Sequence, residues 1–146
     1  MSLPQPEAGL VIRYSYLWYS EFHAGREEGV KDRPCAIVFA VSANEGSGAT
    51  RVLVLPVTHR APDDPGNGIE IPKEVKRRLG LDDDRSWVVL TEWNEFYWPG
   101  PDLRHLPGGD VSTVAYGLLP ARFATHVRKS FAALVRKRRA LGALRT

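Results

Sequence analysis

Hydrophobic residues in this chain gather into two runs, residues 33–41 and residues 52–59, and each run carries polar side chains at one end. Both runs are rich in β-branched and aromatic residues and are bounded by turn-forming residues, a pattern that predicts buried strands. The stretch between them, residues 44–48, has the sequence Asn-Glu-Gly-Ser-Gly, which is a strong turn signal. We therefore expect the two strands to pair as an antiparallel hairpin.

Polar groups stand where this hairpin would begin and end. Arg33 opens the first run, and Thr58 and His59 close the second. In an antiparallel pair the start of one strand lies beside the end of the other, so we expect all three side chains at one edge of a small β-structure. A guanidinium, a hydroxyl and an imidazole together suit the handling of a phosphate group.

Each of these residues also has an ordinary structural explanation. Arg33 could cap the strand or form an ion pair with Asp32 or Glu28. Thr58 could hydrogen-bond within its own turn, and His59 could simply be exposed. Only their convergence at one end of the predicted hairpin favours a functional interpretation.

Shorter hydrophobic segments predict the rest of the sheet and one small helix. Residues 73–79 carry Val75 and Leu79 four positions apart and are followed by Gly80, which is typical of a short helix with a glycine stop. A Pro-rich lead over residues 1–8 is expected to be loosely ordered. The remaining predictions are strands over residues 10–16, 69–71 and 87–93, loops over 19–32 and 61–68, and an aromatic, proline-rich connection over 96–101.

A long helix is predicted near the end of the chain, over residues 120–140. Pro120 suits its first turn, and Phe123, Val127, Phe131 and Leu134 form an apolar stripe at spacings of four, four and three. Several short strands, a small inserted helix and one terminal helix predict a single domain over residues 1–146. We expect a mainly β, α+β fold: a small SH3-like β-barrel with a long basic C-terminal helix against it.

Composition restricts the class of protein. The chain has 146 residues, 43% hydrophobic and 25% charged, which suits one globular domain with a substantial core. It has no run of about 18 apolar residues, and its first residues do not resemble a signal peptide. Its single cysteine, Cys35, has no partner for an internal disulfide. We therefore expect a cytoplasmic protein without a membrane segment.

Charge is distributed unevenly along the chain. The segment after Asp110 holds no acidic residue and eight basic ones, so the first 110 residues carry −5 of a total net charge of +3. Such asymmetry can indicate a polyanionic or acidic partner, and it is equally typical of a solvated basic helix. The basic residues are Arg122, Arg128, Lys129, Arg136, Lys137, Arg138, Arg139 and Arg145.

The order of several short motifs resembles a known family. Gly9-Leu10-Val11-Ile12 comes first, Glu28-Gly29 then precedes Arg33-Pro34 and an apolar strand, and Val54-Leu55-Pro56-Val57-Thr58 follows. This order, over roughly residues 9–95, is similar to the MazF/PemK (Kid-like) toxins of bacterial type II toxin–antitoxin systems. On the later strand, Thr91 and Glu92 replace the polar residue and glutamine that are common in that family.

The resemblance implies a fold, a reaction and partners. Members of the family are homodimers of SH3-like barrels that cleave single-stranded RNA without a metal ion, and a cognate antitoxin protein inhibits them. The family's active-site arginine and threonine fall on Arg33 and Thr58, and its glutamate falls on Glu28. His59 takes the place of a second hydroxyl residue.

Metal-free RNA cleavage needs a base for the 2′-OH, a cation for the phosphorane and an acid for the leaving oxygen. Arg33 suits the charge-stabilising role, and Thr58 can donate a hydrogen bond to the phosphate. His59 or Glu28 would handle the protons. We expect Arg13, Lys31, Arg60 and Trp93 to contact the RNA.

Other candidates are weaker. Tyr14, Tyr16, Trp18 and Tyr19 could stack on bases, as could Trp93, Tyr97 and Trp98, although aromatic residues at this density are mostly core or interface. His23, His105 and His126 lack zinc-like spacing, and no phosphate-binding glycine motif is present, so we expect no metal and no cofactor. Residues 82–84, three aspartates, are predicted to be a solvated turn. The alternative function is a non-catalytic nucleic-acid- or protein-binding module on the same fold, which would bind through the basic C-terminal helix.

Overall fold

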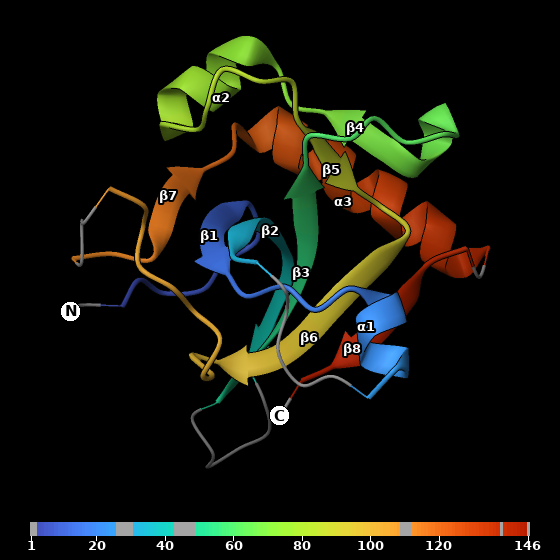
Figure 1. The fold of residues 1–146 in the computed structure, drawn as a ribbon, viewed down its shortest axis with the longest axis horizontal. Helices are drawn as coiled ribbons and strands as arrows, with labels where there is room; N and C mark the ends of the chain where they lie inside the picture. The colour runs from blue at the N-terminus through green and yellow to red at the C-terminus, as the bar shows by residue number, and fades with distance from the viewer. Residues whose placement is uncertain (1–2, 26–30, 43–48, 109–111, 138, 146) are drawn as a thin grey trace.

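A computed structural model describes residues 3–25, 31–42, 49–108, 112–137 and 139–145. In this part of the chain it contains eight strands, three α-helices and one short 3-10 helix, so the predicted α+β class is confirmed (Figure 1). The strands are β1 (Leu10–Tyr14), β2 (Arg33–Ser42), β3 (Thr50–Thr58), β4 (Gly68–Glu70), β5 (Trp87–Val89), β6 (Glu92–Trp98), β7 (Ala115–Leu118) and β8 (Leu141–Leu144). The helices are α1 (Tyr19–His23), η1 (Pro65–Asn67), α2 (Lys73–Leu79) and α3 (Ala121–Arg136).

The sheet is open and mainly antiparallel. Its strands follow the order β4-β5-β3-β2-β1-β7, and β6 pairs with β3 and β8. Strand β3 is therefore central: β2 lies along one edge, while the other edge is shared by β6 near Thr50 and β5 near Thr58. The predicted hairpin is present as β2 and β3, with Cys35 opposite Pro56.

Both faces of the central strands are buried, which explains why their sequences are almost continuously apolar. Val11, Ala36 and Leu55 belong to one hydrophobic cluster, which α3 covers with Val127 and Phe131. The intervening residues of the same strands point to the opposite face. There Ile12, Cys35, Ile37, Val52 and Val54 pack with Tyr14, Tyr16 and Phe96.

Several predicted boundaries were wrong. The segment predicted as one strand over residues 87–93 is two strands, β5 and β6, which pair with different parts of β3. Residues 96–98, predicted as a connection, belong to β6, where their aromatic side chains flank β3. The C-terminal helix, predicted over 120–140, ends at Arg136 because the chain then turns to form β8. None of the helices that the structure describes is long and apolar enough to cross a membrane.

The last described residue of the chain, Arg145, is buried in a polar cluster that we call the Arg145 cluster. Strand β8 runs parallel to β6 and carries the Arg145 side chain into the molecule. Its guanidinium pairs with Asp102 at 3.1 Å and donates to Asn94 Oδ1 at 2.9 Å and to the Ser15 carbonyl at 3.0 Å. One of the eight basic residues of the C-terminal segment is therefore part of the core.

Candidate active site

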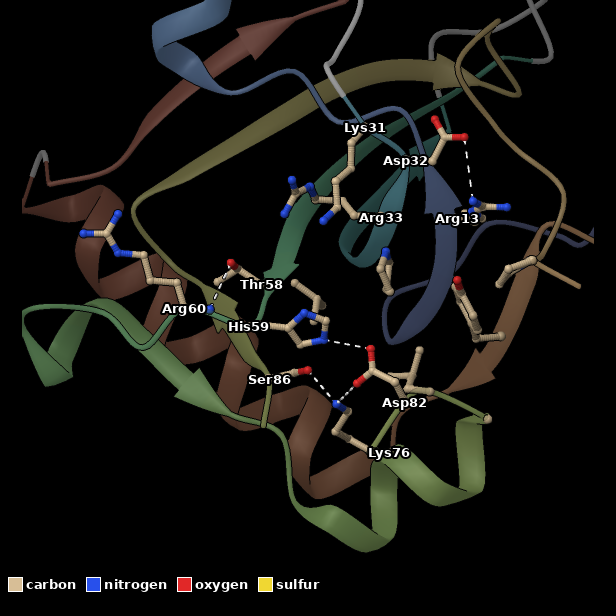
Figure 2. A pocket seen from close by; sticks show the side chains of 16 residues that line it. Arg13, Lys31, Asp32, Arg33, Thr58, His59, Arg60, Lys76, Asp82 and Ser86 are labelled. Carbon is tan, nitrogen blue, oxygen red and sulfur yellow. Dashed lines mark hydrogen bonds and ion pairs between the residues drawn. The ribbon is translucent and has the colours of Figure 1, made fainter. Parts of the chain in front are cut away.

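A pocket of about 630 Å³ lies where the β2–β3 hairpin presents its polar ends. Arg33 begins β2, Thr58 ends β3, and His59 follows directly; all three line the pocket, as the sequence predicted. The other walls come from the end of α2, the loop between α2 and β5, and β7. Figure 2 shows His59 between Arg13, Lys31 and Arg33 on one side and Lys76 and Asp82 on the other.

The lining is rich in positive charge. Five basic side chains line the pocket against two carboxylates, Asp32 and Asp82, so the pocket should attract an anion. Asp32 is shared between Arg13 at 4.0 Å and Arg104 at 3.6 Å. The five basic residues are Arg13, Lys31, Arg33, Arg60 and Lys76.

His59 is held by a carboxylate from the loop between α2 and β5. Its Nε2 lies 2.7 Å from Asp82 Oδ2, and both side chains are about half exposed, at 51% and 52%. A carboxylate on one ring nitrogen fixes the orientation of an imidazole and leaves the other nitrogen for a substrate. Asp82 was not predicted as a partner of His59, because the run of three aspartates at residues 82–84 is typical of a solvated turn.

A buried lysine holds Asp82 in place. Lys76 lies on the inner side of α2, and its Nζ donates to Asp82 Oδ1 at 2.7 Å, to Ser86 Oγ at 2.6 Å and to the Asp84 carbonyl. These three bonds use all three ammonium protons. We call His59, Lys76, Asp82 and Ser86 the Lys76 cluster.

The electrostatics of this cluster favour a charged Asp82. Partial burial raises the pKa of Asp82, but the hydrogen bond and charge of Lys76, followed by those of His59, outweigh it and hold the pKa below its ordinary value. Asp82 therefore stays a carboxylate over the range in which a histidine usually titrates.

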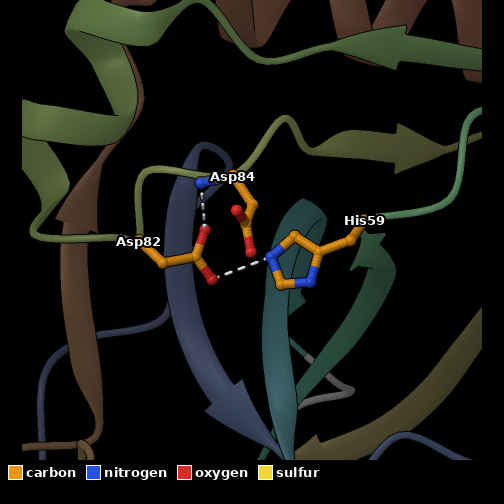
Figure 3. A group of neighbouring side chains, drawn as sticks. All are labelled: His59, Asp82 and Asp84. Atoms are coloured by element: carbon orange, nitrogen blue, oxygen red, sulfur yellow. Dashed lines mark hydrogen bonds and ion pairs between the residues drawn. The ribbon is translucent and has the colours of Figure 1, made fainter.

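His59, Asp82 and Asp84 also resemble a metal-binding group in geometry. Their possible ligand atoms all lie within 4.8 Å of one another, and the imidazole faces both carboxylates (Figure 3). However, Asp82 Oδ1 already accepts hydrogen bonds from the Lys76 ammonium and the Asp84 N–H, the latter at 3.2 Å. A divalent ion would have to compete with that ammonium, so these donors fit an ion-pair network better than a metal site.

Thr58 and Arg33 present different groups to the pocket. Thr58 Oγ1 accepts a bond from the Arg60 N–H at 3.3 Å, and its own proton is donated to no other residue that the structure describes. The Arg33 guanidinium lies over the Trp18 ring, 4.8 Å from its centroid. Its buried Nε has no hydrogen-bond partner among the described residues. The Thr58 hydroxyl proton therefore remains available to a ligand in the pocket, and the contact with Trp18 fixes where the Arg33 guanidinium lies.

Near Arg33 lies a half-buried carboxylate, Glu92. Its Oε1 accepts bonds from the Tyr16 hydroxyl at 3.0 Å and the Tyr19 N–H at 2.9 Å. Burial raises the pKa of Glu92 above its ordinary value, although these hydrogen bonds and the charge of Arg33 partly oppose the shift. Glu92 thus supports the wall that carries Trp18 and Arg33 and does not line the pocket itself.

The other predicted site residues fall into three groups. Arg13, Lys31 and Arg60 line the pocket. Trp93 is not brought to it: its ring packs edge-on against Phe131 at 5.5 Å and lies against Gly142, so it secures α3 and β8. Glu28 lies outside the described residues. Lys76 and Ser86 were not predicted as site residues. One signal for Lys76 was present in the sequence: it adjoins the apolar positions of α2 and lies six residues before the acidic run.

Comparisons of the chain with protein-family models, curated proteins and solved structures find no match.

Proposed function

We propose that this protein is a metal-independent endoribonuclease that cleaves single-stranded RNA, a growth inhibitor of the MazF/PemK kind. The observation that carries this proposal is the convergence of Arg33, Thr58 and His59 in one basic pocket at the end of the β2–β3 hairpin. A guanidinium, a hydroxyl and an oriented imidazole suit such a reaction, and the pairing of β2 with β3 brings Arg33 beside Thr58 and His59.

The proposed reaction is attack of the ribose 2′-oxygen on the adjacent phosphorus. The P–O5′ bond breaks, and a cyclic phosphate and a free 5′-hydroxyl form. His59 accepts the proton of the 2′-hydroxyl as the new P–O2′ bond forms and then donates a proton to the departing O5′, with Asp82 fixing the ring at 2.7 Å. Arg33 and Arg60 stabilise the charge that develops on the phosphorane, and Thr58 donates its hydroxyl proton to a phosphate oxygen.

The wider context is also a proposal. An SH3-like arrangement is supported by the way β3 pairs with β2 on one edge and with both β5 and β6 on the other. The proposal also includes two partners, a second copy of the chain and an antitoxin protein, and binding either of them needs exposed apolar surface. Leu118 on β7 and Leu141 and Leu144 on β8 are between 44% and 54% exposed, which supports contacts of this kind.

The test is RNA cleavage in the presence of EDTA, with wild type beside Arg33→Ala. Losing one stabilising donor should lower the cleavage rate by about 10²–10³-fold. Arg51→Ala is a matched control, because Arg51 is an exposed β3 arginine that pairs with Glu95 at 2.6 Å near the opposite end of the strand. Wild type that leaves mixed-sequence RNA intact, with EDTA or with magnesium, would rule out the enzymatic proposal.

One observation favours the alternative, a pocket that binds RNA without cutting it. Metal-free cleavage uses an acid and a base, and among the described lining residues His59 is the only side chain of a type that ordinarily titrates near neutral pH. A binding module would hold a 2′-O-methyl oligonucleotide with steep salt dependence and would leave RNA uncut. The basic C-terminal segment is best tested by Arg136→Gln at the end of α3 and Arg139→Gln in the connection to β8, because truncation would remove β8 and Arg145 from the fold.

A further inference from the structure

Strand β7 brings a tyrosine, Tyr116, to the wall of the candidate active site. In the strand order β3-β2-β1-β7, two strands separate β7 from the strand that carries Thr58. Tyr116 and Thr58 therefore reach the pocket from different walls. Two hydroxyls placed in this way can bind different oxygens of one phosphate group.

Tyr116 is the extra residue of a β-bulge. Ile12 of β1 lies opposite Ala115, and Val11 lies opposite Gly117, so two consecutive residues of β1 face three residues of β7. A bulge interrupts the regular alternation of side chains along a strand and re-aims one of them, often beside an active site. Here the residue between the two pairs, Tyr116, is one that lines the pocket.

Gly117 allows the backbone of β7 to take this shape. Its φ of +136° lies in a region that residues with a side chain rarely adopt. A Cβ at this position would also lie 3.0 Å from Leu79 Cδ2 of α2, closer than an ordinary contact. Position 117 therefore favours glycine for two reasons, its conformation and the room beside it, and this glycine directly follows the tyrosine.

The two ends of the Tyr116 side chain have different surroundings. The residue is half-buried, and its ring packs against the hydrophobic cluster that α3 covers. The hydroxyl donates to no residue in the part of the chain that the structure describes. The charges that act on this hydroxyl include those of Arg13, Asp82 and Asp32, which all line the pocket, so the hydroxyl end faces that space.

This environment makes Tyr116 a hydrogen-bond donor to an anion. Burial raises the pKa of Tyr116 above its ordinary value, although the charge of Arg13 opposes the shift. The hydroxyl therefore keeps its proton at neutral pH. A hydroxyl that donates to a charged oxygen forms a shorter and stronger bond than one that donates to a neutral group, so a phosphate oxygen is a suitable acceptor.

We propose that the Tyr116 hydroxyl donates a hydrogen bond to a non-bridging oxygen of the scissile phosphate, which makes Tyr116 a further catalytic residue of this pocket. This deepens the proposed function and rests on it. The hydroxyl keeps its proton throughout, while His59 moves the proton from O2′ to O5′. The phosphorane carries more negative charge than the bound phosphodiester, so the contact should affect the cleavage rate more than the affinity.

The test is Tyr116→Phe, which removes the hydroxyl and keeps the packed ring. Its single-turnover rate of RNA cleavage in EDTA should fall by about 10²–10³-fold, the usual effect of losing one preorganised donor. Its affinity for 2′-O-methyl RNA, which cannot be cleaved because the attacking hydroxyl is blocked, should fall by only about 2- to 10-fold. Urea denaturation of both proteins checks that the variant folds like wild type.

Tyr97→Phe is the matched control. Tyr97 is a 51% exposed tyrosine of β6 and is not among the described residues that line the pocket. The same change of a hydroxyl to hydrogen at this position should leave both the cleavage rate and the affinity for 2′-O-methyl RNA within about twofold of wild type.

The outcomes distinguish this inference from the proposed function. If wild type and Tyr116→Phe cleave RNA at the same rate, the role of Tyr116 is overturned and the enzyme remains. If wild type cleaves no RNA, the proposed function fails, and the phosphate contact is judged by binding alone. Weaker binding of 2′-O-methyl RNA by Tyr116→Phe would then support the contact, and unchanged binding would overturn it as well.

Discussion

Two clusters in this molecule are each built around a cation that the fold buries. Arg145 is 6% exposed and Lys76 is 5% exposed, and each pairs with an aspartate and donates to a backbone carbonyl. The two clusters differ in how exposed the aspartate is. The side chain of Asp102 is 10% exposed, whereas that of Asp82 is 52% exposed and also contacts His59. The Arg145 cluster is closed on itself, whereas the Lys76 cluster opens onto the pocket.

The difference shows how a similar interaction serves two purposes. A closed cluster satisfies its own charges and fixes β8, β6 and the preceding loops against one another. An open cluster uses a buried cation to hold a carboxylate at the surface, where that carboxylate can orient a histidine. We therefore expect substitutions in the first to act mainly on stability and substitutions in the second to act mainly on activity.

The largest stability change is expected from Arg145→Met. The substitution leaves Asp102 inside the protein without its guanidinium partner, and breaking such a buried pair typically costs about 3–5 kcal/mol of unfolding free energy. Urea denaturation measures it. Arg139→Ala, at an exposed arginine of the same segment, is the control and should change the free energy of unfolding by less than about 0.5 kcal/mol. A loss below about 1 kcal/mol for Arg145→Met would mean that the cluster is not closed.

Lys76→Met should have a smaller effect on stability. Asp82 can turn to solvent when the ammonium is removed, so we expect a loss of about 1–3 kcal/mol, mainly from Ser86 and the Asp84 carbonyl. RNA cleavage should fall as well, because Asp82 is no longer anchored beside His59. Unfolding and cleavage measured on the same preparation test both parts. Full activity in a destabilised variant would show that Lys76 is structural only.

The smallest effect is expected from Glu92→Gln, and it depends on pH. Because burial raises the pKa of Glu92 in the folded state, the folded protein binds a proton more readily than the unfolded chain. Proton binding to Glu92 therefore stabilises the folded wild-type protein at low pH. This stabilisation is lost as pH rises from the unfolded pKa of Glu92 through its folded pKa. Glutamine keeps the acceptor for Tyr16 and Tyr19 without the charge.

The measurement compares unfolding free energies of wild type and Glu92→Gln at pH 4 and pH 7. From pH 4 to pH 7, the free energy of unfolding of Glu92→Gln should rise relative to that of wild type. The contributions of carboxylates that both proteins share cancel in this difference. A relative loss at pH 7 would show that the ionised Glu92 stabilises the wall behind Arg33.

Sequence patterns predicted the parts of this molecule that depend on local periodicity. The β2–β3 hairpin, α2 over residues 73–79 and the convergence of Arg33, Thr58 and His59 follow from apolar runs, turn residues and antiparallel geometry. Strand β8 was missed because Leu-Gly-Ala-Leu has no strand signal of its own; its pairing with β6 and the insertion of Arg145 define it.

The Lys76 cluster was missed for a similar reason. Lys76 and the aspartates of residues 82–84 look like ordinary surface charges in the sequence, and only the packing of α2 against the sheet turns one lysine inward. Trp93 was predicted to contact RNA because aromatic residues stack well on bases. In the structure its ring packs against Phe131 and Gly142 instead. Long-range packing, which periodicity does not encode, decided both cases.

The central claim is that the open cluster performs chemistry through His59. The most direct measurement is the single-turnover rate of RNA cleavage in EDTA for wild type and His59→Asn, with urea denaturation of both. His59 is half exposed, so the variant should unfold within about 0.5 kcal/mol of wild type, and its rate should fall by about 10²–10⁴-fold. A folded His59→Asn protein that cleaves RNA at the wild-type rate would contradict the claim.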